Sequence, residues 1–259
     1  MRWFISIRYL LTHMRQSLVC VAGVTISVTM FIGMSSMMEG FKDKFIIETV
    51  ESSGHITVND EPRVTRTPIL ESYFTQPGAL LELEGVRPKE KIEKIKNPGG
   101  LMAALRRMPQ VIDVAPVVKG DAVATFGTKT YAMLVEGVEP EKQTEVTTIG
   151  KKIVAGSFDR LKKTADGIVL GRGVALTLGV KVDDNVTLTS SGGGRTASKV
   201  VGIFETGVTP VDYSRGYMLM SDAQTLLNKK NIVNEIIIRT TDYTQAREIA
   251  AQIEAISGY

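Results

Sequence analysis

Residues 18–38 read LVCVAGVTISVTMFIGMSSMM, a run of 21 residues without one charged side chain. As an α-helix this run would reach ~31 Å, which matches the ~30 Å hydrocarbon core of a bilayer. A buried helix of a water-soluble protein is usually shorter and carries a polar stripe. The run therefore predicts a transmembrane helix over residues 18–38.

The main alternative for this run is a cleaved signal peptide. The apolar core of a signal peptide is typically only ~7–15 residues long and ends at a small-x-small cleavage site. Here the run is longer and ends in Met37 and Met38, followed by Glu39. An uncleaved membrane anchor fits these residues better.

The charges before the run orient the predicted span. Residues 1–17 contain Arg2, Arg8 and Arg15 but no acidic residue, and such flanks stay in the cytoplasm by the positive-inside bias. Residues 39–259 are then extracytoplasmic. The three arginines also account for the whole net charge of +3. Because the remainder is neutral and phosphate binding needs clustered cations, nucleic acid is not expected as a partner.

Residues 1–17 predict an amphipathic helix in the headgroup layer. Aromatic rings (Trp3, Tyr9) alternate with cations (Arg8, Arg15), a pattern that suits the membrane interface. The alternative is that these residues only extend the span. We interpret Trp3, Arg8, Tyr9 and Arg15 as interfacial anchors.

Small residues inside the span predict contacts with other helices. Gly23 with Ser27, and Thr29 with Gly33, form small-xxx-small pairs, which let another helix approach closely. We take these four residues as the candidate helix-packing positions of the span.

The extracytoplasmic part, residues 39–259, predicts an α+β fold with two lobes. A helix runs on from the span, and a proline-rich stretch occupies residues 60–98. Strand–helix pieces at both ends of this part are expected to pair into one split βαβ-like lobe, residues 41–149 plus 231–259. Residues 150–230 would form a smaller, inserted β-rich lobe. The expected strands cover residues 55–58, 111–126, 131–138, 167–171, 186–189, 198–204, 217–220 and 235–239. The expected helices cover residues 101–108, 140–149, 172–178, a segment opened by residues 221–223, and residues 243–256, with Asp242 as N-cap.

The sequence contains no motif that predicts an active site. It has no GxxxxGK[ST] phosphate loop and no GxSxG elbow, and the glycines at 192–194 fit a hairpin turn. His13 and His55 are the only histidines and fall on opposite sides of the predicted span. Cys20 is the only cysteine, interpreted as a buried structural thiol, so no disulfide and no cysteine-rich metal site are expected. We expect no catalytic residue, metal or cofactor; an anchored hydrolase built on His55 is a minor alternative.

Four stretches in their order resemble a known family. They are ISIRYL at residues 5–10, MMEGF at 37–41, GSFDRLKKTADGIVLGRGVALTLGVKVDDNVTL at 156–188, and VGIFETG at 201–207 followed by YMLM at 217–220 and AQTLL at 223–227. Together they resemble the permease subunits of bacterial ABC transporters of the lipoprotein-release and macrolide-exporter type (FtsX-like permeases), with their MacB-like periplasmic core domain. The likeness covers nearly the whole chain except residues 60–98.

The resemblance implies a permease of the bacterial inner membrane without an active site of its own. It would pass the motion of a separate cytoplasmic ABC ATPase to the extracytoplasmic domain, for lipoprotein release or substrate export. Its implied partners are that ATPase, a second permease subunit or the remaining membrane spans, and a lipoprotein or other envelope substrate. The alternative is a single-pass sensor or adaptor module without transport activity.

Two departures from the family pattern bear on this expectation. Family permeases have four spans, whereas this chain stops at Tyr259, which implies a split subunit, a gene fragment or an engineered piece. Members that hand lipoprotein to a soluble carrier extend a long hook from one hairpin, but the equivalent turn at residues 190–198 is short. A general exporter is therefore an equally open expectation.

Overall fold

The structure is a computed structural model that describes residues 12, 14–60, 94–242 and 245–257. The anchor residues Trp3, Arg8 and Tyr9 lie outside the described residues, as does most of the proline-rich stretch. The chain divides into two compact units, Met1–Glu48 and Thr49–Tyr259.

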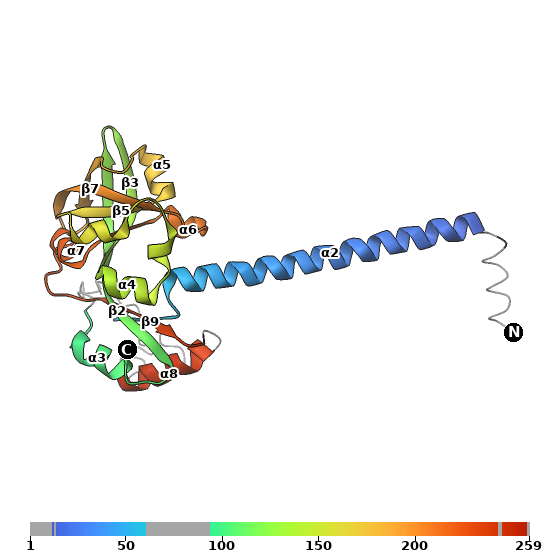
Figure 1. Cartoon of the computed structure of the whole chain (residues 1–259), viewed down its shortest axis with the longest axis horizontal. Helices are drawn as coiled ribbons and strands as arrows, with labels where there is room; N and C mark the ends of the chain where they lie inside the picture. The colour runs from blue at the N-terminus through green and yellow to red at the C-terminus, as the bar shows by residue number, and fades with distance from the viewer. Residues whose placement is uncertain (1–11, 13, 61–93, 243–244, 258–259) are drawn as a thin grey trace, which may run out of the picture. The chain divides into compact units, whose positions relative to one another are not determined.

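The first unit consists, as far as it is described, of one long helix. Helix α2 runs from Met14 to Ser53 without a break, so it contains the predicted span and its predicted continuation (blue in Figure 1). It is apolar on all sides across residues 18–38 and holds no proline, which leaves nothing to bend or end it within the span. The helix stops at Gly54, which adopts the left-handed conformation at φ +79° that favours glycine at helix ends.

The strands described in the second unit form one nine-stranded mixed sheet. These strands are β1 (Ile56–Asn59), β2 (Val111–Phe126), β3 (Lys129–Val138), β4 (Ile153–Gly156), β5 (Gly167–Gly171), β6 (Asn185–Ser190), β7 (Arg195–Phe204), β8 (Arg215–Leu219) and β9 (Glu235–Thr240). The helices around them are α3 (Pro98–Leu105), α4 (Pro140–Val146), α5 (Arg172–Leu178), α6 (Thr209–Asp212), α7 (Met220–Leu226) and α8 (Ala246–Ser257), with 3-10 turns η1 (Ile149–Lys152) and η2 (Phe158–Lys162).

Six of these strands close into a ring. Each pairs with the next in the order β2-β3-β8-β5-β7-β6, and β6 pairs back onto β2. The side chains inside the ring form one apolar core, to which Val135, Leu170, Leu188 and Met218 contribute, each with an exposure of 0%. Closure removes free edges from this part of the sheet. Strand β4 extends it by pairing with β7.

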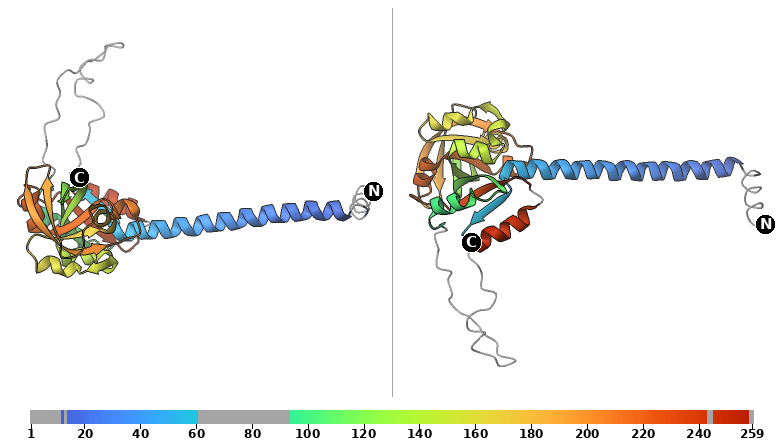
Figure 2. Two further views of the ribbon diagram at one scale, coloured as in Figure 1. Left: turned by 90° about the horizontal axis from the view of Figure 1, so that it is seen from above. Right: turned by 60° about the horizontal axis from the view of Figure 1, so that its bottom comes forward.

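The remaining strands form a three-stranded lobe. Strand β9 lies between β1 and residues 111–117 of β2 and is antiparallel to both. Strands β1 and β2 are therefore parallel and separated by β9, which is the split βαβ arrangement that the sequence predicted. Helices α3 and α8 lie at the same end of the domain as β9 (Figure 1), and α8 runs beside β1 (Figure 2). Leu105, Ile236, Ile238, Ile249 and Ile253 form the buried core of this lobe.

The structure confirms the α+β class and locates the ends of the expected strands within two residues, except that β7 begins three residues before the expected position 198. The boundary between lobes expected at residues 149–150 stays a prediction. Strands on both sides of it pair with each other, because β2 pairs with β6 and β3 pairs with β8. The elements that were not predicted are strand β4, helix α6 and the turns η1 and η2. Helix α7 begins at Met220 and has Leu219 as N-cap without a side-chain cap, so residues 221–223, expected to open and cap this helix, lie inside it instead. The predicted N-cap role of Asp242 involves residues outside the described ones.

Candidate functional site

Helix α2 presents an apolar surface that no other described part of the chain covers. Its candidate span covers Met14–Ile46 with a mean hydropathy of 2.0, and none of the most apolar window is buried. Large side chains such as Phe31 (73% exposed) and Met37 (79%) point outward. So large an apolar surface requires a membrane or other helices as its environment.

The small residues of the span lie on two faces of α2. Ser27 donates from Oγ to the Gly23 carbonyl at 2.9 Å, which satisfies the hydroxyl within the helix and suits an apolar surrounding. At ~100° per residue, Gly33 lies about 80° around the helix from Gly23 and Thr29 about 120° from it. The structure thus brings each pair together but does not place both pairs on one face.

The space beside the span's glycines is open. A Cβ added at Gly23 or Gly33 would meet nothing within 4 Å, so no described segment fills either position. Their role in helix packing stays a prediction. Arg15 lies exposed in the first turn of α2, and its anchoring role is likewise untested.

Cys20 corrects an expectation. The sequence suggested a buried thiol, but Cys20 is free and exposed on α2. The reason is that no described segment packs against this part of the helix, so an apolar neighbourhood in the sequence does not become a protein interior.

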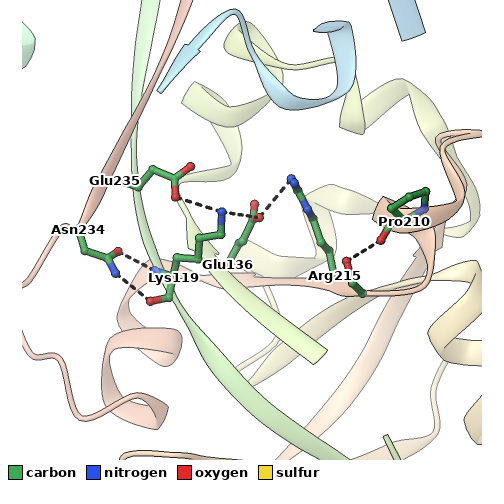
Figure 3. A network of polar contacts seen from close by, with 7 residues as sticks. Lys119, Glu136, Pro210, Arg215, Asn234 and Glu235 are labelled. Atoms are coloured by element: carbon green, nitrogen blue, oxygen red, sulfur yellow. Dashed lines mark hydrogen bonds and ion pairs between the residues drawn. The ribbon is translucent and has the colours of Figure 1, made fainter. Parts of the chain in front are cut away.

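In the second unit, polar side chains gather where the ring meets the three-stranded lobe. We call Lys119, Glu136, Arg215, Asn234 and Glu235 the junction cluster; Figure 3 shows them as sticks. They come from β2, β3, β8, the residue before β9, and β9 itself. The cluster therefore joins strands of both parts of the sheet.

The backbone of Lys119 is held by the side chain of Asn234. The Lys119 N–H donates to Asn234 Oδ1 at 2.8 Å, and Asn234 Nδ2 donates to the Lys119 carbonyl at 2.9 Å. The Asn234 N–H donates in turn to the Val117 carbonyl at 3.3 Å. The Asn234 carboxamide thus makes the two hydrogen bonds to Lys119 that the backbone of a partner strand would make, at the point where β2 and β9 separate. Asn234 is only 5% exposed.

The charges of the junction cluster balance around Glu136. This carboxylate is 2% exposed and lies 3.3 Å from Arg215 Nη1 and 4.0 Å from Lys119 Nζ. Lys119 Nζ also lies 3.2 Å from Glu235 Oε2, so the ammonium group stands between two carboxylates (Figure 3). Burial raises the pKa of Glu136, while Arg215 and Lys119 act in the opposite direction. Burial likewise raises the pKa of the neighbouring Tyr217 hydroxyl.

A second buried carboxylate organises the loop between β7 and α6. Asp212 accepts hydrogen bonds from the Thr206 N–H at 2.8 Å, the Thr206 hydroxyl at 2.7 Å and the Gly207 N–H at 3.1 Å. Asp212 is 6% exposed. Because these three hydrogen bonds all come from its own loop, the Asp212 carboxylate stabilises a turn.

Among the described residues, no group of three or more His, Cys, Asp or Glu could hold a metal ion. His55 accepts at Nδ1 from the Thr240 N–H at 3.2 Å and lies 2.8 Å from the Thr240 hydroxyl, so it joins the end of α2 to β9. A hollow of about 590 Å³ on the outer face of β2, β3 and β6 is lined mainly by small and apolar residues, among them Val123, Ala132 and Leu134.

Sequence reasoning missed the junction cluster. Its signal was a single acidic residue, Glu136, in the otherwise apolar strand segment AMLVEGV. A period of two would place that residue beside core positions, but nothing in the sequence shows which cations face it. The predicted hairpin at residues 192–194 is confirmed, because β6 ends at Ser190 and β7 begins at Arg195.

Comparison with known families gives a match over nearly the whole chain. The sequence model of the MacB-like periplasmic core domain family matches residues 17–256. The match therefore includes most of α2 and nearly all of the second unit.

Individual relatives are distant and longer. The chain is 24% identical over 264 residues to the lipoprotein-releasing system transmembrane protein LolC of Xylella fastidiosa, covering 96% of this chain and 56% of the relative. It is 24% identical over 265 residues to LolC of Neisseria meningitidis serogroup B, covering 96% and 57%. The chain is also 34% identical over 84 residues to LolE of Haemophilus influenzae, covering 32% and 20%. It thus spans little more than half the length of the LolC relatives.

The likeness to solved structures is weaker still. The extracellular domain of the noncanonic ABC-type transporter YknZ from Gram-positive bacteria is 13% identical with a TM-score of 0.44, covering 61% of this chain and 83% of that one. The periplasmic region of MacB from Actinobacillus actinomycetemcomitans is 12% identical with a TM-score of 0.43, covering 61% and 73%.

Proposed function

The chain belongs to the MacB-like periplasmic core domain family, and on that premise we propose that it is the permease component of an ABC transporter. In this role α2 crosses the bacterial inner membrane with its N-terminus in the cytoplasm, and residues 54–259 form the extracytoplasmic domain. A cytoplasmic ATPase supplies the motion. The domain uses that motion to release a lipoprotein or export a substrate.

One observation carries this proposal. The family match runs through the uncovered apolar helix and the folded domain together, over residues 17–256. A long helix that leads without a break into a folded domain can pass a tilt or shift on to it. The sequence contains no GxxxxGK[ST] phosphate loop, and in the proposed role the energy comes from a separate ATPase subunit.

Two observations bear on the class of cargo: the names of the relatives and the length of one hairpin. The longer relatives are named as lipoprotein-releasing system proteins, which favours a lipoprotein or another lipid-bearing envelope substrate. The β6–β7 hairpin has a turn of only residues 191–194 and offers no long arm for a soluble carrier. We therefore favour release or export without capture by this hairpin.

The decisive experiment is purification of the tagged full chain from bacterial inner membranes in mild detergent. We expect it to copurify with a Walker-motif ATPase and a protein carrying further spans, and to stimulate ATP hydrolysis of the assembled complex. Gly23→Leu should weaken this copurification, because the leucine would fill the face on which a neighbouring helix can approach closely.

The matched control is Val24→Leu, which leaves a bulky residue on another face of the same helix. If both variants reduce copurification equally, or neither reduces it, Gly23 does not form the contact with the neighbouring helix. A chain that repeatedly purifies without an ATPase or a second membrane subunit would instead support the single-pass sensor or adaptor.

A further inference from the structure

Strand β2 changes partners at the junction cluster. Its residues 111–117 pair with β9, residues 117–126 pair with β3, and residues 122–125 also pair with β6. Lys119 lies just beyond the last pair with β9, Val117 with Glu235. Strand β2 is thus the one continuous strand shared by the ring and the three-stranded lobe, and Lys119 marks the point where it passes between them.

Both the backbone and the side chain of Lys119 bridge this point. Its backbone N–H and carbonyl are held by Asn234, while its ammonium group contacts Glu235 in the lobe and Glu136 in the ring. Arg215 holds the other side of Glu136 from β8. A relative rotation of ring and lobe would have to separate Lys119 from one of its two carboxylates.

Stability alone is a weak explanation for a charge network built on the buried Glu136, with Lys119 and Arg215 partly buried beside it. Well-packed apolar residues can replace a buried ion network without loss of stability, because desolvating the charges offsets much of their attraction. What apolar residues cannot supply is direction, since charged and amide hydrogen bonds fix the angle between their partners. The cluster is therefore suited to fixing the geometry between two parts of the domain.

We propose that the junction cluster is a latch that makes the ring and the three-stranded lobe move as one body. Helix α2 leads through Gly54 and His55 into β1 of the lobe, so a displacement of the helix enters the domain at the lobe. While the contacts of the junction cluster are intact, this displacement is passed on to the β2–β3 and β6–β7 hairpins of the ring. This inference rests on the proposed function for its purpose, but the rigidity it asserts is a property of the chain alone.

The test is a distance measurement between two spin labels on the full chain in detergent micelles, without ATPase or cargo. In a Cys20→Ser background, one label is placed at Thr128→Cys in the β2–β3 turn and the other at Ala251→Cys on α8; both positions are exposed. We expect a narrow distance distribution in the parent. Lys119→Met should broaden it roughly twofold, because a lost latch frees a hinge motion.

Two further variants keep the test decisive. Asn234→Ala removes the backbone clamp without leaving a buried charge and should also broaden the distribution. Arg160→Gln, which breaks the surface pair with Asp183 at 2.7 Å, should leave it unchanged. If Asn234→Ala and every folded Lys119 variant keep the parent width, the latch is refuted. If these variants broaden the distance distribution but the purified chain copurifies with no ATPase and no second membrane subunit, the latch is upheld and the proposed function is rejected.

Discussion

At the scale of single residues, Glu136 links burial to a pH dependence of stability. Because burial raises its pKa above the ordinary value of 4.5, the folded chain holds a proton on Glu136 more tightly than the unfolded chain does. Its contribution is then fully present below the unfolded-state pKa and is lost as pH rises through the folded-state pKa. We expect the unfolding free energy of the parent, minus that of Glu136→Gln, to fall as pH rises from about 4 to 8.

Denaturant titrations of the full chain in micelles at several pH values measure this difference. Glu141→Gln is the control, because the exposed Glu141 carboxylate has its pKa lowered by the hydrogen bond from Lys162. Its small contribution is present above pH 4.5 and is lost only as pH falls below that value, which is the opposite direction. A parent–Glu136→Gln difference that stays constant across the range would contradict the assignment.

Asp212 gives a second prediction at this scale. Asp212→Ala should lower the unfolding free energy by about 3 kcal/mol, because two backbone N–H groups and a hydroxyl lose a charged acceptor in a buried loop. Asp159→Ala, at an exposed position of η2, should change it by no more than about 0.5 kcal/mol. Equal effects in equilibrium denaturation would show that Asp212 is not what holds the loop.

At the scale of elements, the joint between α2 and β1 depends on Gly54. A Cβ there would lie 2.3 Å from Ile237 Cγ2 on β9, and the residue already has a positive φ of 79°. Gly127, in the β2–β3 turn, also has a positive φ but nothing within 4 Å. Substitution of Gly127 therefore tests backbone strain alone, whereas substitution of Gly54 adds a steric clash with Ile237.

We expect Gly127→Ala to cost about 1 kcal/mol of stability, the penalty of the left-handed conformation alone. Gly54→Ala should cost about 1–3 kcal/mol more, because Ile237 must also move. Thermal unfolding of both variants, followed by the circular dichroism of the sheet, measures the difference. Equal destabilisation would mean that the joint is loosely packed.

At the scale of the whole molecule, the proposed membrane arrangement can be read from thiol labelling. In a Cys20→Ser background, Thr128→Cys should react with a membrane-impermeant maleimide applied to intact spheroplasts. Arg15→Cys should react only after permeabilisation, because positive flanks remain cytoplasmic. The native Cys20, within the apolar part of α2, should react poorly in both conditions.

Detergent-solubilised protein is the control, in which Arg15→Cys and Thr128→Cys should both be labelled. Labelling of Arg15→Cys in intact spheroplasts, with Thr128→Cys protected, would invert the topology. Labelling of neither before permeabilisation would place the domain in the cytoplasm.

Local patterns were enough to determine most of the helices and strands of this protein. The uncharged run at residues 18–38 predicted the helix, since length and hydropathy are properties of consecutive residues. The strands around Leu134, Ile168 and Ile236 followed from their apolar and β-branched residues, and the turn at Gly193 from its glycines. The family resemblance followed in the same way, from motifs in their order.

Only the tertiary structure decided how these elements combine. Closure of the ring depends on β6 pairing with β2, and the junction cluster depends on Lys119, Glu136 and Arg215 meeting from three strands. These pairings join residues as far apart in the sequence as Glu136 and Arg215, and the alternation within each strand is compatible with several partners and registers. Cys20 shows the converse, since its apolar neighbours could predict a hydrophobic environment but not whether protein or lipid would supply it.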